Sequence, residues 1–215
     1  MEYIVITADV VNSKLEMFGS SDIELRLKEL NLMFKDDLAA PFSIMKGDEI
    51  QSMVNIASFS KIFKIIRSLK YIFGPYKLRI GVGVGDVYEK FQNISKFNNS
   101  WEIDGQAFHL ARAAMDSTRI NKRESIKMSV CFNFENKYLS DKFNIIYSFV
   151  TDIIDRWKED TWNIINELEK GIIHEEIARI LDYDRSNVTK KIGRSNWYKI
   201  ITTEKLLISM FERGE

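Results

Sequence analysis

Short apolar runs alternate with amphipathic helical patterns over the first 150 residues, and their order constrains the fold most strongly. The patterns predict strands at residues 3–8, 42–46, 50–55 and 77–87, and helices at residues 21–38, 59–69 and 105–117. Two later strands are expected at residues 126–132 and 143–149. Strand-helix-strand-strand-helix-strand is the order of a ferredoxin-like sandwich. The sequence therefore predicts an α/β (α+β) domain over residues 1–150.

Beyond residue 151 the pattern is helical only. Apolar residues at helical spacing predict one helix over residues 151–171 and a last helix over about residues 203–211. Between them, residues 174–192 are predicted to form two short helices joined by a tight turn. We therefore expect a small all-α domain over residues 151–215, in which Trp157 and Trp162 pack against the front domain or a second subunit.

Residues 174–192 have the small and apolar residues that a helix-turn-helix needs where its two helices cross, among them Ala178 and Val188. Asp182 stands where such turns often have glycine, and aspartate tolerates the left-handed backbone conformation better than most residues. Asp184 is expected to be the N-cap of the second helix, with its carboxylate accepting backbone N–H groups. The segment therefore predicts a helix-turn-helix.

Cations gather in and after the second helix, although the whole chain has 31 basic and 31 acidic residues. Residues 185–199 include five cations and no acidic residue. Such a stretch attracts DNA phosphates, so we expect this helix to enter the major groove of double-stranded DNA. The predicted DNA contacts are Arg185, Ser186, Asn187, Thr189, Lys190, Lys191, Arg194 and Lys199. The alternative is an ordinary helical hairpin with a solvated basic face. We also expect a homodimer, formed through the helix at 151–171 or the last helix.

Two carboxylates of the front domain suggest a metal site. In a ferredoxin-like sheet the first strand pairs antiparallel with the third, so Asp9 is expected beside Asp48. Paired carboxylates repel each other unless a cation or proton lies between them, and hard oxygen ligands suit Mg²⁺ or Mn²⁺. A nucleotide is expected nearby, at Val10, Asn12, Ser13, Lys46, Gly47, Glu49, His109 and Arg112. The alternative is that Asp9 and Asp48 only accept backbone N–H groups.

A glycine-rich strand lies in the same domain. Gly81, Gly83 and Gly85 fall on one side of their strand, which leaves the backbone accessible to a close-lying group. His109 lies between Phe108 and Leu110, a setting that favours a core or cleft-lining histidine over a general base or metal ligand.

The order of these segments over residues 3–118 resembles the catalytic domain of class III nucleotide cyclases and, more distantly, that of diguanylate cyclases. The resemblance implies that Asp9 and Asp48 hold two metal ions on a nucleoside triphosphate. Lys46 to Ile50 is similar to the hairpin of the diguanylate cyclases.

The chain departs from the cyclase pattern at its transition-state residues. Class III cyclases have an asparagine four residues after the glycine that opens this helix, and an arginine four residues later. Counted from Gly105, this chain has His109 and Ala113, and its Arg112 comes one residue early. One residue turns a helical side chain by about 100°. Ile44 stands in place of the lysine that reads the base. Metal and phosphate binding fit this pattern better than catalysis does.

The whole chain also resembles the SatD family of bacterial proteins. The elements that carry the resemblance are the opening at residues 9–14, the Gly-Asp-Glu hairpin at 47–51, the glycine strand at 79–85, the helix at 105–112 and the C-terminal helix-turn-helix. The resemblance implies no particular activity.

Composition narrows the class of protein further. No run reaches the roughly 18 apolar residues of a membrane span, and the N-terminus lacks the basic leader of a signal peptide. We therefore expect a cytoplasmic protein.

The leading hypothesis is a DNA-binding transcriptional regulator whose front domain senses a nucleotide with a divalent metal. The alternative is an enzyme, a metal-dependent nucleotidyl cyclase or related phosphoryl-transfer protein that uses Asp9 and Asp48.

Overall fold

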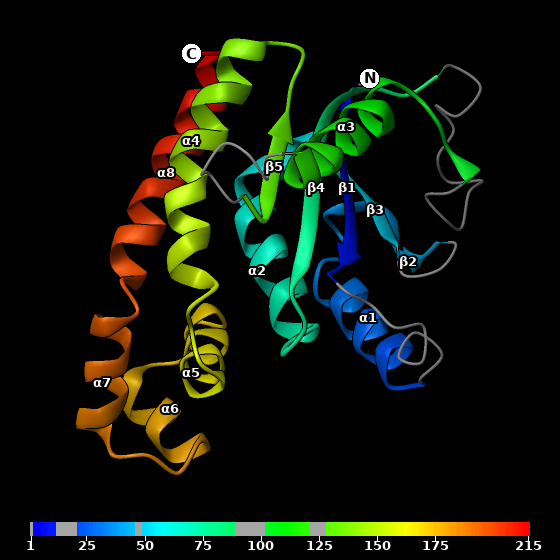
Figure 1. The fold of residues 1–215 in the computed structure, drawn as a ribbon. Helices are drawn as coiled ribbons and strands as arrows, with labels where there is room; N and C mark the ends of the chain where they lie inside the picture. The colour runs from blue at the N-terminus through cyan, green and yellow to red at the C-terminus, as the bar shows by residue number, and fades with distance from the viewer. Residues whose placement is uncertain (1, 12–20, 46–48, 89–101, 121–127) are drawn as a thin grey trace.

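A five-stranded sheet forms the centre of the front domain (Figure 1). The computed structural model describes residues 2–11, 21–45, 49–88, 102–120 and 128–215. Its strands are β1 (Glu2–Val10), β2 (Leu38–Ile44), β3 (Ile50–Asn55), β4 (Leu78–Asp86) and β5 (Val130–Asn133), in the spatial order β2-β3-β1-β4-β5. The first four pair antiparallel, and β5 pairs parallel with β4.

Helices connect the strands in the predicted order. The front domain has α1 (Ser21–Met33), a 3-10 helix η2 (Ile56–Lys61), α2 (Ile62–Ile72), α3 (Gln106–Ile120) and α4 (Lys137–Ile154). The order β1-α1-β2-β3-α2-β4 with antiparallel pairing is ferredoxin-like, and it confirms the α+β prediction. Ala8 lies opposite Ile50, so the end of β1 does lie beside the start of β3.

One predicted strand of the front domain was wrong, and the bounds of two other elements differ from the prediction. Residues 143–149 form the middle of α4 and not a strand, because buried Phe143, Tyr147 and Val150 recur at helical spacing. The first helix ends at Met33, and β2 begins at Leu38, which is earlier than the strand expected at 42–46. The boundary expected at residue 150 falls inside α4, which packs against β5.

The two faces of the sheet are covered by different helices. Alternate residues of β1 face opposite sides. Ile4 and Ile6 belong to the main core with residues of α1, α2 and α4, whereas Tyr3 and Val5 pack with α3. The last helix joins the main core, since Phe211 stacks on Phe59 with ring centroids 3.5 Å apart.

The glycines of β4 let α3 lie directly on the strand. A Cβ on Gly83 would lie 2.2 Å from the backbone nitrogen of Ala111, and one on Gly81 would lie 2.2 Å from the Ala111 carbonyl oxygen. Gly85 faces the same helix. The prediction of a close-lying group on one side of this strand is therefore confirmed, and that group is the backbone of α3.

The C-terminal helices build a second core. They are α5 (Glu159–Glu169), α6 (His174–Ile180), α7 (Arg185–Arg194) and α8 (Trp197–Arg213). The single helix expected over 151–171 is two helices, because α4 ends at Ile154 and α5 begins at Glu159. The last helix begins at Trp197, earlier than the expected 203. The shared core consists of Ile164, Ile165, Ile177, Ala178, Val188, Ile192 and Trp197.

Candidate functional site

Asp9, the residue before the last of β1, forms a bidentate ion pair. Arg79 lies directly opposite on β4, and its Nε and one terminal nitrogen donate to the two carboxylate oxygens at 2.6 and 2.7 Å. The Asp9 side chain is 6% exposed and that of Arg79 is 28% exposed. The predicted metal ligand therefore has a guanidinium at both oxygens.

A second carboxylate-arginine pair lies at the same end of the sheet. The two terminal nitrogens of Arg112, on α3, donate to Glu49 at 2.9 and 2.5 Å. The hydroxyl of Thr7 also donates to Glu49, at 3.0 Å. Glu49 precedes β3, so the structure brings together two residues predicted to bind a nucleotide, and it pairs them with each other.

The other residues predicted for this site have different places. Val10 is buried and paired with Leu78 of β4. His109 is 66% exposed, so it is not a core residue. Its Nε2 lies 3.3 Å from the Tyr88 hydroxyl and 3.7 Å from Asp104. Asn12, Ser13, Lys46, Gly47 and Asp48 lie outside the described residues. In the part of the chain that the structure describes, no cluster of three or more carboxylate, histidine or cysteine ligands occurs.

α6 and α7 form a helix pair around a buried contact. Ile177 and Ala178 of α6 pack with Val188 and Ile192 of α7, all of them buried. Asp182 in the connecting turn has φ 54°, which confirms the predicted left-handed conformation. α7 begins at Arg185, directly after the expected N-cap Asp184, and ends at Arg194.

Asp184 is the N-cap of α7, as predicted, but its side chain accepts no hydrogen bond there. Its carbonyl oxygen instead accepts from the backbone nitrogen of Asn187 at 2.9 Å. The start of the helix therefore depends on the backbone and not on the predicted carboxylate cap.

The outward face of α7 is polar and basic. Ser186, Lys190 and Arg194 are exposed and four residues apart, so they share one face of the helix. The remaining predicted DNA contacts that are exposed are Arg185, Asn187, Thr189 and Lys199. Lys191 differs, because its ammonium forms an ion pair with Asp160 of α5. Thr189 lies 3.2 Å from the His174 ring nitrogen of α6.

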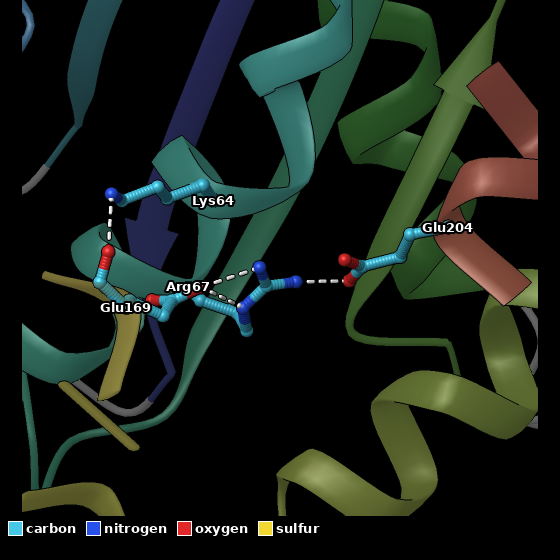
Figure 2. Close-up of polar contacts among 4 residues, drawn as sticks. All are labelled: Lys64, Arg67, Glu169 and Glu204. Atoms are coloured by element: carbon cyan, nitrogen blue, oxygen red, sulfur yellow. Dashed lines mark hydrogen bonds and ion pairs between the residues drawn. The ribbon is translucent and has the colours of Figure 1, made fainter. Parts of the chain in front are cut away.

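A buried ion network joins the front domain to the C-terminal helices, and the sequence did not predict it (Figure 2). Arg67 of α2 is 3% exposed and donates to Glu169 of α5 at 2.9 and 2.5 Å. Another of its nitrogens donates to Glu204 of α8, which is 4% exposed. The guanidinium also lies 5.2 Å from the ring centroid of Trp197. One arginine therefore holds two helices of the C-terminal unit.

Other residues on the same side of α2 continue this junction. Lys64 donates to the main-chain oxygen of Glu169 at 2.9 Å, and Tyr71 donates to Asn163 of α5 at 3.0 Å. Lys70, which is buried, donates to Asp155 after α4 at 2.7 Å. Polar residues three and four apart on an otherwise apolar helix were the sequence signal for this junction.

The tryptophans expected to pack within the protein do so. Trp157 and Trp162 meet edge to face with ring centroids 4.9 Å apart, and Trp162 lies 6.3 Å from Tyr71 of the front domain. The predicted packing against the front domain is confirmed.

Comparison with known proteins supplies the family. The model of the SatD family matches residues 3–207. The chain belongs to the SatD family. Among curated proteins the comparison found no match. In the described part of this SatD protein, no helix is both long enough and apolar enough to cross a membrane.

The ion network of this SatD protein predicts a pH-dependent stability. Burial raises the pKa of Glu204 from 4.5 to about 7, although the guanidinium of Arg67 opposes the rise. A carboxyl whose pKa rises on folding contributes stability that is present below its unfolded pKa and is lost as the pH rises through its folded pKa. Because of Glu204, the free energy of unfolding should therefore fall progressively as the pH rises from 4.5 to 7.

Glu204→Gln should remove this dependence, because glutamine still accepts from Arg67 but does not ionise. Relative to the variant, the wild type should lose about 3 kcal/mol of unfolding free energy as the pH rises across that window. Urea unfolding at both ends of the window measures it, with the exposed Glu212→Gln as the matched control. Parallel pH profiles for wild type and Glu204→Gln would contradict the prediction.

Proposed function

We propose that this protein is a DNA-binding transcriptional regulator with a C-terminal helix-turn-helix and a cyclase-like front domain that binds a nucleotide with Mg²⁺ or Mn²⁺. The observation that carries the proposal is the outward face of α7. Within the described residues, Arg185, Lys190 and Arg194 are exposed and have no carboxylate partner. Lys190 and Arg194 share the outward face, and Arg185 lies at the start of the helix. Unpaired cations in these places suit DNA phosphates and base edges. Such a regulator acts in the cytoplasm, and a homodimer would present two copies of α7.

The difference between two adjacent lysines tests DNA binding. Lys190 is exposed on the outward face, whereas Lys191 is paired with Asp160. Lys190→Ala should weaken DNA binding about tenfold. It should also reduce the steepness of log affinity against log salt concentration by about one. Lys191→Ala should change the affinity less than about threefold. Fluorescence anisotropy with DNA from upstream of the protein's own gene measures both. Equal losses for the two variants would contradict the proposed orientation of α7.

The proposed nucleotide site depends on exchange of ion-pair partners. Asp9 and Glu49 hold Arg79 and Arg112 by bidentate contacts at one end of the sheet. A divalent cation that took over the carboxylates would free guanidinium groups for phosphate oxygens, which they bind bidentately. The described residues do not form a metal site by themselves, so Asp48 is needed as a second ligand.

Sensing fits this site better than turnover does. The cyclase positions for the catalytic asparagine and arginine hold His109 and Ala113, and His109 is exposed. The alternative is an enzyme, a metal-dependent phosphoryl-transfer protein using Asp9 and Asp48, and it needs a group that stabilises the transition state, which neither His109 nor Ala113 matches.

Replacing both carboxylates distinguishes sensor, enzyme and structural role. Asp9→Asn with Asp48→Asn should abolish Mn²⁺-dependent nucleotide binding, measured by calorimetry with ATP and with GTP. Exposed Asp36→Asn with Asp141→Asn is the matched control. Chromatography of the nucleotide should find no product from the wild type. Product formation would support the enzyme, and unchanged binding by the Asp9 variant would contradict the proposed site.

The Arg67 junction offers a physical route between the two proposed sites. Arg67 lies on α2 under the sheet, and its partners lie on α5 and α8, the helices that pack on α7. A shift of α2 would therefore change how α5 and α8 pack on α7. The expected consequence is that nucleotide with Mn²⁺ changes DNA affinity in the wild type.

A further inference from the structure

One face of α4 has apolar and charged residues at heptad spacing. Tyr138, Ile145 and Phe149 are 66, 56 and 69% exposed. The opposite face buries Leu139, Phe143, Tyr147, Val150 and Ile154 against the sheet and α8. Both faces of this helix therefore have apolar stripes, and the described residues of the monomer cover only one of them.

The exposed stripe continues through charged residues. Its members on α4, four and three residues apart in turn, are Tyr138, Lys142, Ile145, Phe149 and Asp152. This alternation of four and three is the spacing at which one helix packs along another. The Lys142 ammonium lies 4.2 Å from the ring centroid of Tyr138, so the stripe begins with a cation over an aromatic ring.

The stripe is complementary to itself. When two copies run antiparallel and are centred on residue 147, Ile145 of each lies opposite Phe149 of the other. The same register sets Lys142 opposite Asp152, an attractive ion pair that occurs twice, once on each side of the centre. Twofold symmetry requires such reciprocal pairing, in which residue i meets j and j meets i.

We propose that this face of α4, named here the α4 stripe, is the surface through which two copies of the protein form an antiparallel dimer. Its apolar centre supplies burial, and its reciprocal charges set the register. The chain has a net charge of zero, so no long-range repulsion opposes association of two copies. The proposal does not depend on DNA or nucleotide binding, and it places most of the dimer contact before residue 151, where the first of the two helices expected from sequence begins.

Charge reversal tests the register. Lys142→Glu places a glutamate opposite Asp152, and Asp152→Lys places a lysine opposite Lys142, so each single variant should dimerise at least about tenfold more weakly. An equal mixture of the two variants should dimerise again, because every pair across a mixed dimer is then attractive. Sedimentation velocity of the full chain without DNA measures the association.

The controls separate the α4 stripe from general charge effects and from misfolding. Lys28→Glu and Asp36→Lys, both at exposed positions near α1, make the same charge changes elsewhere and should leave the dimer intact. Phe149→Glu should give a monomer with an unchanged thermal unfolding midpoint. Mixing it with the charge variants should not restore the dimer. A monomeric wild type, single variants that dimerise like the wild type, or a mixture that stays monomeric would each overturn the proposal.

Discussion

Arg67→Met is expected to destabilise the protein by about 3–5 kcal/mol, because it leaves Glu169 and Glu204 buried without their cation. The loss should be smaller at low pH, since the pKa of Glu204 is raised by burial to about 7 and its protonated form needs no partner. Urea unfolding of wild type and variant, at one pH below that pKa and one above it, measures both effects.

Lys64→Met is the matched control on the same helix. Among the described residues, Lys64 donates to the main-chain oxygen of Glu169 alone, so its loss should cost less than about 1 kcal/mol. A triple replacement of Arg67, Glu169 and Glu204 by methionine should recover much of the lost stability, as apolar groups can substitute for a buried ion network. An Arg67→Met protein as stable as the wild type would show that this junction does not hold the two parts together.

The strand and helix order of the front domain could be predicted because each element has its own local pattern of apolar residues. The buried residues of β1 are contiguous, and the helices repeat apolar residues at helical spacing. The strand predicted at residues 143–149 was wrong because the aromatic and β-branched residues of this segment also suit a strand. Only the longer repeat from Leu139 to Ile154 distinguishes the helix.

The interruption between α4 and α5 had no local signal. Residues 155–158 contain neither glycine nor proline, so a continuous helix over 151–171 was the natural prediction. The turn before α7 was predictable, because Asp182 stands at a position that needs left-handed backbone.

The sequence indicated which segments carry the candidate sites, but not the ion-pair partners of their residues. The end of β1 and the basic face of α7 follow from spacing, whereas the partners Arg79 and Asp160 follow only from the folded chain. The Arg67 network joins residues more than 100 positions apart, so no local pattern contains it. Its only signal was a row of polar residues on an apolar helix.

The second large effect concerns DNA. Arg185→Ala with Lys190→Ala should lower affinity for the specific site about 100-fold, because it removes an exposed cation from the start of α7 and another from its outward face. Neither side chain has an ion-pair partner in the described part of the fold, so the variant should keep the unfolding free energy of the wild type within about 0.5 kcal/mol. Loss of binding without loss of stability is the combination that a recognition helix requires.

The measurement that tests the central claim most directly is fluorescence anisotropy of labelled DNA from upstream of the protein's own gene, over a salt titration. The account predicts tight, salt-sensitive binding by the wild type and by Lys28→Ala with Lys35→Ala, an equal charge change at exposed positions near α1. It predicts loss of specific binding for Arg185→Ala with Lys190→Ala. Wild-type protein that binds no DNA at low salt, or a double variant that binds as the wild type does, would contradict it.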